Sequence, residues 1–302
     1  MNVLAVLQGA LAQGMIWGIM ALGAYISYKV LDFADLSVDG TFALGGAVSM
    51  VLTVNGMNPF LSLPFAMLAG MGGGLVTALL ATKIKIPGLL AGILTMLSLY
   101  SINLMIMGSP NTPIKANLSV VELVQTVLPV SHDLASSLIG AVFCVVLIAL
   151  LYCFFGTELG CALRASGNNP HMAKALGVNT DTMVIVGLML SNGLVALSGG
   201  LWTQHLGVAD VNVGVGVMVT GLASIIIGQV IFRFLRRNFA LKLAVAVLGS
   251  ICYWLVVTLV VTLGLGTNNL KLLTALMVVI AMAVPMVKEK IQVAAHVRGE
   301  GK

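Results

Sequence analysis

Long uncharged apolar segments separate the few charged residues of this chain, and they constrain its fold more than any other feature. A typical example is the run at 86–114, which has no Asp, Glu, Lys, Arg or His. A helix needs about 20 residues to cross the hydrocarbon core of a bilayer. Only 8% of the residues are charged, too few to cover the surface of a soluble domain. The pattern therefore predicts an all-α polytopic transmembrane helical bundle.

The uncharged runs predict about nine spans, within a range of eight to ten. The run at 41–82 is long enough for two helices, and the turn-forming residues Asn55, Gly56, Asn58 and Pro59 divide it. The other runs are 1–28, 86–114, 134–157, 182–204, 211–232, 243–270 and 272–287. The first run leaves room for a broken or re-entrant element. We expect residues 1–302 to form a single transmembrane domain.

Basic residues are distributed unevenly between the two sides of this ladder of spans. Only Lys115 and Lys271 fall on one side. The other side carries Lys29, Lys83, Lys85, Arg164, Lys174, Arg233, Arg236, Arg237, Lys242, Lys288, Lys290, Arg298 and Lys302. The positive-inside rule then predicts an N-terminus outside and a C-terminus in the cytoplasm. The first run lacks the basic start of a cleavable signal peptide, so we expect it to be retained.

Several kinds of chemistry are missing from the sequence. There is no GxxxxGK[ST] phosphate loop, no basic stripe suited to nucleic acid, and no His or Cys spacing typical of a metal site. We therefore expect no enzyme, no bound cofactor or metal, and no nucleic-acid partner. The centres of the predicted spans also lack ionisable residues, which proton-coupled carriers use. An energy source outside this chain is favoured, although sodium coupling through backbone carbonyls stays open.

The loop at 156–181 contains the signals of a short helix. Asn169 suits the N-cap, Pro170 the first helical position, and Gly177 the left-handed residue after the last turn. A helix at 170–176 is too short to be stable alone in water, so it must dock on lipid or on a protein groove.

One face of this short helix is suited to contact with another surface. Met172, Ala173 and Leu176 share that face by their three-and-four spacing, whereas Lys174 points elsewhere. A small central residue with a basic flank fits a protein groove at least as well as lipid.

Two loops resemble those of a known family. The loop after the fifth predicted span resembles the cytoplasmic loop of permease subunits of bacterial ABC importers for branched-chain amino acids. The residues that carry this resemblance are Gly160, Arg164–Ala165, Met172–Ala173, Leu176–Gly177 and Asn179–Thr180. The stretch from Ala165 through Gly167 to Asn169, with Asn168, looks like the related ribose permeases, and 31–40 is similar to the segment between the first two spans in both groups. The subgroup described as tryptophan or tyrosine permeases is especially similar.

This resemblance implies a permease subunit in a bacterial inner (plasma) membrane. Two permeases, expected here as a homodimer, would form the path for a small amino acid-like solute, with an aromatic amino acid favoured. A separate ABC ATPase subunit would use ATP and Mg, and an extracytoplasmic binding protein would deliver the solute. Carried over residue by residue, the ATPase-coupling helix and its loop comprise Arg164, Gly167, Asn168, Asn169, Pro170, Met172, Ala173, Leu176 and Gly177.

Within that loop, the resemblance gives Ala173 the role of the small contact residue and Arg164 that of a brace. The chain departs from the branched-chain importers at Asn168, Asn169 and Pro170, where acidic residues are usual. A partner ATPase specific to this permease would account for the difference. A stand-alone secondary carrier and a structural membrane subunit remain as alternative hypotheses.

Candidate gate residues lie on the predicted cytoplasmic side, just before the second predicted span. Asp32, Asp35 and Asp39 fit either a solvated acidic loop or a gate in which the segment from Ser37 to Gly40 caps the following helix. For the solute path, Asn103, Asn192 and Trp202 are uncharged side chains that can hydrogen-bond or stack with a ligand. The alternative for Trp202 is an aromatic belt at the membrane surface, which is the more common use of tryptophan.

The opposite side of the ladder carries two candidate docking loops. The Ser109–Pro113 turn cluster leads into a surface helix predicted at 118–128, and the second loop, 204–212, contains His205 and Asp210. These loops either receive a binding protein or pack at the interface. Within the spans, we expect Gly72, Gly73, Gly74, Gly199 and Gly200 to let helix backbones approach closely.

Overall fold

The computed structural model describes residues 3–113, 119–235 and 238–263, and the single positions 272, 275, 276 and 279. Eight helices in this part are long and apolar enough to cross a membrane, which confirms the all-α polytopic bundle. The predicted ninth span at 272–287 lies outside the described residues except at those four positions. Lys115, Lys271 and the basic residues beyond 271 also lie outside them.

Eight long helices follow one another along the chain with short elements between them. The long helices are α1 (Val3–Tyr25), α2 (Ser37–Val54), α3 (Pro59–Thr82), α4 (Gly88–Met107), α6 (His132–Gly156), α9 (Thr180–Leu206), α10 (Val217–Ile231) and α11 (Phe239–Thr262). The short elements are the π-helix η1 (Ile26–Val30), β1 (Asn111–Pro113), α5 (Val120–Val127), α7 (Glu158–Asn168), α8 (Pro170–Ala175), β2 (Val208–Asp210) and the 3₁₀ helices η2 (Val211–Gly214) and η3 (Arg233–Leu235).

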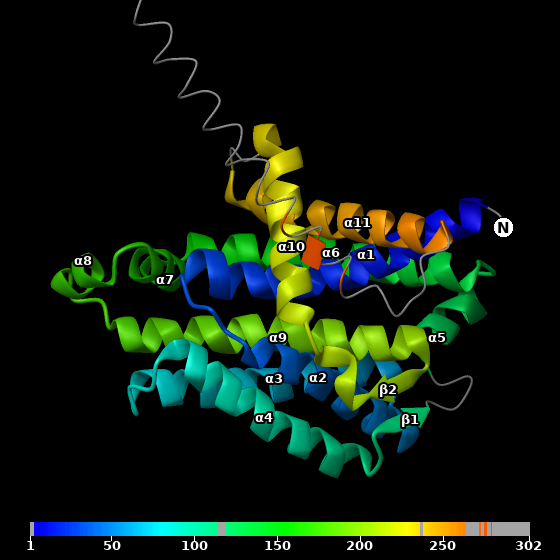
Figure 1. Cartoon of the computed structure of the whole chain (residues 1–302), viewed down its shortest axis with the longest axis horizontal. Coiled ribbons are helices and arrows are strands. Elements are labelled where there is room, and N and C mark those ends of the chain that lie inside the picture. The colour runs from blue at the N-terminus through cyan, green and yellow to red at the C-terminus, as the bar shows by residue number, and fades with distance from the viewer. Residues whose placement is uncertain are drawn as a thin grey trace, which may run out of the picture.

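Helix α9 lies at the centre of the bundle. It packs against α1 on one side and against α2 and α3 on the other. Figure 1 shows α1, α6 and α11 in one layer and α2, α3 and α4 in another, with α9 between them. Residues 191–204 of α9 are all buried, so this half of the helix is enclosed by its neighbours.

Two helices begin inside the bundle rather than at its ends. After η1, the chain runs without helical structure from 31 to 36, and Asp35 at its end is fully buried before α2 starts at Ser37. Helix α10 starts at Val217 beside α2 and runs across the direction of the neighbouring long helices (Figure 1). The first uncharged run forms a single span, and α1 continues directly into the π-helix at its end.

Glycines in the spans allow close helix contacts, as predicted, with one exception. A Cβ on Gly74 would meet the Leu188 carbonyl of α9, and one on Gly199 would meet the Phe42 carbonyl of α2. Gly73 and Gly200 are also in contact with neighbouring side chains, but Gly72 has nothing within 4 Å. The prediction is wrong for Gly72 because it faces away from the helices that pack on α3.

Candidate functional site

The predicted short helix forms between α7 and α9 at one end of the bundle. The Asn169 side chain accepts a hydrogen bond from the Met172 N–H (3.0 Å), and Pro170 occupies the first turn. Gly177 has φ 83° in the left-handed region, and the next N–H, that of Val178, bonds back to the Ala173 carbonyl (3.0 Å). All three local signals therefore act as predicted, and Figure 1 shows α7 and α8 projecting beyond the long helices.

A groove with a volume of about 350 Å³ lies between α7 and α8. Met172, Ala173 and Leu176 all line it, as their spacing predicts. Ala173 is only 1% exposed and forms part of the floor, whereas Met172 is 59% and Leu176 71% exposed. A partner protein would therefore contact Met172 and Leu176 first. The small side chain of Ala173 would matter mainly by allowing α8 to pack closely on the rest of this chain.

Arg164 fixes α7 against the end of α6. Its Nη2 donates to the Phe155 carbonyl at 2.8 Å, and its guanidinium carbon lies 5.3 Å from the centre of the Phe239 ring. This geometry is consistent with the brace implied by the family resemblance. Gly167 lies directly against the Val30 carbonyl, so α7 also contacts the π-helix that ends α1. Asn168 is exposed beside it.

A second group of predicted residues meets in the bundle interior. The Asp35 carboxylate accepts hydrogen bonds from the Ser37 N–H (2.9 Å), the Ser37 hydroxyl (2.6 Å) and the Asn192 amide (2.7 Å). The Thr41 hydroxyl donates a hydrogen bond to the side-chain oxygen of Asn192 at 2.7 Å. Ser37 and Asn192 were expected in the path, whereas Asp35 and Thr41 were missed as their partners. Together they join the start of α2 to the middle of α9.

This network corrects the view of the acidic segment as a solvated loop. Asp32 is exposed, but Asp35 has no exposed surface, and Asp39 is half-buried. Burial raises the pKa of the Asp35 carboxyl, and the hydrogen bonds from Ser37 and Asn192 oppose that shift. Asp35 itself lies between two spans, at 31–36, and its partner Asn192 is on α9.

Asp39 caps a different helix from the one predicted. Its carboxylate accepts hydrogen bonds from the Gly216 N–H (2.9 Å) and the Met218 N–H (2.8 Å) at the start of α10. The start of α2 is bonded by Asp35 instead, so the prediction that Ser37 to Gly40 caps α2 is wrong. A carboxylate at a helix N-terminus is favoured by the helix dipole. Asp39 therefore ties α2 to α10 in the interior.

Asn103 and Trp202 make no hydrogen bond to this network among the described residues. Asn103 on α4 donates to the Gly40 carbonyl at 3.2 Å, and its Oδ1 is buried without a hydrogen bond. Trp202 lies ten residues beyond Asn192 on α9 and packs between Trp17 and Trp254 with ring centres 5.6 and 5.9 Å away. Because Trp202 is buried, an aromatic belt does not describe it. All three tryptophans of the chain meet here.

At the other end of the bundle, the two candidate docking loops form one structure. Strands β1 and β2 pair antiparallel, with Asn111 opposite Asp210. The predicted surface helix is present as α5, with a capping box between Ser119 and Glu122. Gln204 on α9 accepts from the Val120 N–H (2.9 Å), which anchors α5 to the bundle.

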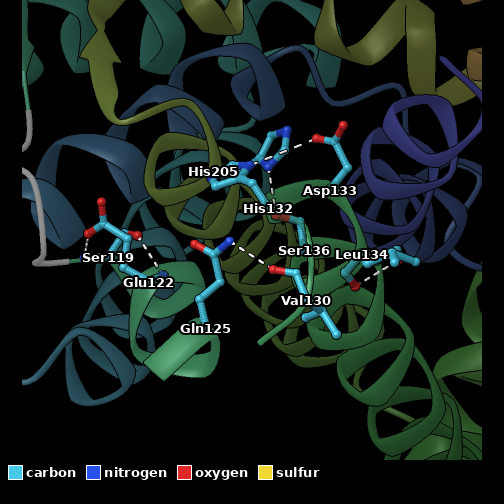
Figure 2. A network of polar contacts seen from close by, with 10 residues as sticks. Ser119, Glu122, Gln125, Val130, His132, Asp133, Leu134, Ser136 and His205 are labelled. Carbon is cyan, nitrogen blue, oxygen red and sulfur yellow. Dashed lines mark hydrogen bonds and ion pairs between the residues drawn. The ribbon is translucent and has the colours of Figure 1, made fainter. Parts of the chain in front are cut away.

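Figure 2 shows how this end is held together. The Gln125 amide of α5 donates to the Val130 carbonyl at 3.1 Å, just before α6 begins. His205, at the end of α9, lies 2.8 Å from the Ser136 hydroxyl of α6. His132 and Asp133 form an ion pair at 3.8 Å. The β1–β2 pair and α5 therefore lie at the same end of the bundle, and Val127 of α5 is 79% exposed.

Among the described residues, no group of three or more His, Cys, Asp or Glu side chains is placed to hold a metal ion. Cys144, Cys153, Cys161 and Cys252 are free thiols. The interior residues described above offer hydrogen-bonding groups on α2, α4 and α9 and an aromatic cluster from α1, α9 and α11.

Comparison with known proteins agrees with this arrangement. The chain is 40% identical over 273 residues to a tyrosine transport system permease protein from Clostridioides difficile (strain R20291), which covers 90% of this chain and 89% of that protein. It is 36% identical over 279 residues to an uncharacterized protein of Rickettsia prowazekii (strain Madrid E), covering 91% and 95%. It is 26% identical over 220 residues to a ribose import permease protein from Escherichia coli (strain K12), covering 72% and 67%.

No solved structure matches the chain. The family model described as "branched-chain amino acid transport system / permease component" matches residues 6–283. That range includes the α7–α8 loop, the interior network and the paired loops at the opposite end. The chain belongs to this family of transport permeases, and it is a multi-pass membrane protein.

Proposed function

We propose that this protein is the permease subunit of an ATP-driven importer for an aromatic amino acid. The observation that carries the proposal is the pair of helices α7 and α8, called here the α7–α8 unit. The short helix α8 packs on the rest of the chain through Ala173 and leaves the large apolar side chains of Met172 and Leu176 exposed. Exposed Met and Leu on an ordered helix at the edge of a bundle suit a protein partner. In this proposal the partner is a separate ABC ATPase, which uses ATP and Mg while this chain binds neither.

The α7–α8 unit is connected to the interior network by direct contacts. Helix α7 packs on η1 through Gly167, and η1 leads through residues 31–36 to Asp35 and the start of α2. Asp35 then bonds Asn192 in the middle of α9, whose first turn follows α8 by four residues. A displacement of α8 would therefore reach the interior network from two sides. Alternating access follows if the ATPase states hold α8 in two positions.

The interior groups suit an uncharged or zwitterionic aromatic solute. Ser37, Asn103 and Asn192 provide hydrogen-bonding groups, and Trp202 lies in a cluster of three indole rings. The similarity to a tyrosine transport permease supports an aromatic amino acid as the solute. We place this path in a homodimer of permeases in the inner membrane, with the β1–β2 and α5 surface facing an extracytoplasmic binding protein.

The decisive experiment is co-purification of the ATPase with variants of α8. Met172→Glu/Leu176→Glu places two carboxylates on the exposed apolar surface and is expected to abolish ATPase retention and tyrosine uptake while leaving membrane expression unchanged. Ala175→Glu is the matched control, because Ala175 is exposed on the same helix but does not line the groove. Normal ATPase retention by the double variant would show that α8 is not the coupling contact.

A second experiment, on solute uptake, tests the identity of the solute separately from the ATPase partner. Uptake of labelled tyrosine by the reconstituted system, competed by phenylalanine, leucine and ribose, tests the aromatic preference. If the ATPase is retained but only leucine or ribose is taken up, the importer hypothesis is supported and the hypothesis of an aromatic solute is rejected. Uptake that continues in proteoliposomes without any ATPase would instead support a secondary carrier.

A further inference from the structure

A polar pocket with a volume of about 540 Å³ lies beside η1, separate from the α7–α8 groove. Three cationic side chains line it, one from each of three elements: Lys29 of η1, Arg164 of α7 and Lys242 of α11. Asp32 is the acidic residue in its lining, and Phe239 lies beside Arg164. The path described above does not use this pocket, although Arg164 also borders the groove.

The pocket carries excess positive charge without local neutralisation. Three cations and one carboxylate leave a net charge of +2 in its lining. Within the described ranges, no carboxylate oxygen comes within 4.0 Å of Lys29, Arg164 or Lys242, since the single ion pair there joins His132 and Asp133. Like charges gathered around one cavity repel one another, so an anion between them lowers the electrostatic energy.

Arg164 is held in place before any ligand arrives. Both of its hydrogen bonds within the described part start from Nη2, one to the Phe155 carbonyl (2.8 Å) and one to the Cys161 sulfur (3.3 Å). Its Nε is buried without an acceptor, and Nη1 has no hydrogen bond to a described residue. A guanidinium fixed by a carbonyl and an aromatic ring loses little freedom on binding, and its fork geometry suits phosphate oxygens.

Two backbone features fix the cationic walls relative to each other. The direct contact of Gly167 with the Val30 carbonyl sets the spacing between α7 and η1. Residues Ile26–Val30 form a π-helix, and the wider turn presents Tyr28 and Lys29 to the pocket. Single π turns within α-helical segments are frequent at functional sites. The pocket is therefore a preformed feature of the fold.

We propose that this pocket binds the phosphate oxyanion of an anionic ligand. The ligand is either the headgroup of an anionic phospholipid or free inorganic phosphate, because both present the same oxygens to Arg164. Basic pockets between transmembrane helices near a membrane surface are typical lipid headgroup sites. Lys29 lies in the last turn of η1 and Lys242 in the first turn of α11, and Arg164 on α7 faces the same pocket from outside the long helices. The proposal does not depend on which solute is transported.

The test uses the full-length permease in nanodiscs of phosphatidylcholine alone or with phosphatidylglycerol, and separately in detergent with inorganic phosphate or with chloride at equal ionic strength. The readouts are native mass spectrometry of retained lipid and the midpoint of thermal unfolding. Lys29→Gln/Lys242→Gln removes two pocket cations at exposed positions, so folding should be preserved. Lys83→Gln/Lys85→Gln is the matched control, with the same charge change at the α3–α4 connection.

The expected result is ligand binding about thirty-fold weaker in the pocket variant, the effect of removing two cations near an anionic group, and unchanged binding in the control. Retention of phosphatidylglycerol with no response to phosphate identifies a lipid site. Stabilisation by millimolar phosphate without selective lipid retention identifies a free-phosphate site. Equal weakening in both double variants, or no preference for either anion, overturns the proposal.

Discussion

Asp35 is the residue whose environment departs most from what its type suggests. It is a carboxyl group with no exposed surface, held between α2 and α9 by three hydrogen bonds. Removing water from a carboxylate costs more than these bonds return, which is why burial raises its pKa above the ordinary value of 3.8. The interior junction therefore carries a proton-dependent element.

This environment predicts how stability changes with pH. Because the pKa of Asp35 is higher in the folded state than in the unfolded state, the folded protein keeps a proton that the unfolded chain releases. The stabilisation is complete below about pH 3.8 and is lost as the pH rises through the folded-state pKa. Asp35→Asn removes this titration. The difference in unfolding midpoint, wild type minus Asp35→Asn, should fall as the pH is raised from 4 to 8.

Thermal unfolding in one detergent at matched ionic strength measures that difference. Asp32→Asn serves as the control, since it makes the same substitution at an exposed position of the same segment. Parallel curves for wild type and Asp35→Asn would mean that Asp35 keeps the same pKa on unfolding, contrary to its burial.

At the scale of elements, α9 packs on α2 and α3 through glycines that bring backbones into contact. A Cβ on Gly45 of α2 would lie 2.6 Å from the Ala196 Cα of α9 and closer still to the Ala196 carbonyl. The neighbouring atoms are backbone, so they cannot move aside as a flexible side chain does. Gly45→Ala should therefore destabilise the protein by about 3 kcal/mol.

Gly72→Ala provides the matched comparison on α3. Gly72 is helical and has nothing within 4 Å, so the same substitution should raise stability by roughly 0.5–1 kcal/mol through reduced backbone freedom in the unfolded chain. Denaturant titration in detergent gives both values. Similar effects of the two substitutions would contradict packing as the role of Gly45.

Local elements were predictable from sequence because their causes are local. Asn169, Pro170 and Gly177 act within one turn of α8, and the capping residues of α5 act within three positions. The interior network was only half predicted, since Asp35 and Asn192 are 157 positions apart and no local pattern joins them. The same holds for Asp39, which caps a helix 177 residues away, and for the meeting of Trp17, Trp202 and Trp254.

Across the whole molecule, the two ends of the bundle differ in chemistry. One end carries α7, α8 and the basic pocket with Lys29, Arg164 and Lys242. The opposite end carries the β1–β2 pair and α5, where Glu122, Asp133 and Asp210 are found. With the ninth span predicted from the sequence, thirteen of the 15 Lys and Arg residues fall on the side of α7 and α8. By the positive-inside rule we expect that side to face the cytoplasm.

This orientation can be tested with thiols that the structure already exposes. Cys161 on α7 is exposed, and in a background of Cys144→Ala, Cys153→Ala and Cys252→Ala it is the remaining cysteine. A membrane-impermeant maleimide should leave Cys161 unlabelled in intact spheroplasts and label it after permeabilisation. Adding Val127→Cys and Cys161→Ala to the same background moves the thiol to α5, where Val127 is 79% exposed, and labelling should then occur in intact spheroplasts. The opposite labelling pattern would mean that the protein has the reverse orientation, with α8 on the side that no cytoplasmic ATPase can reach, and it would reject both the orientation and the coupling role of α8.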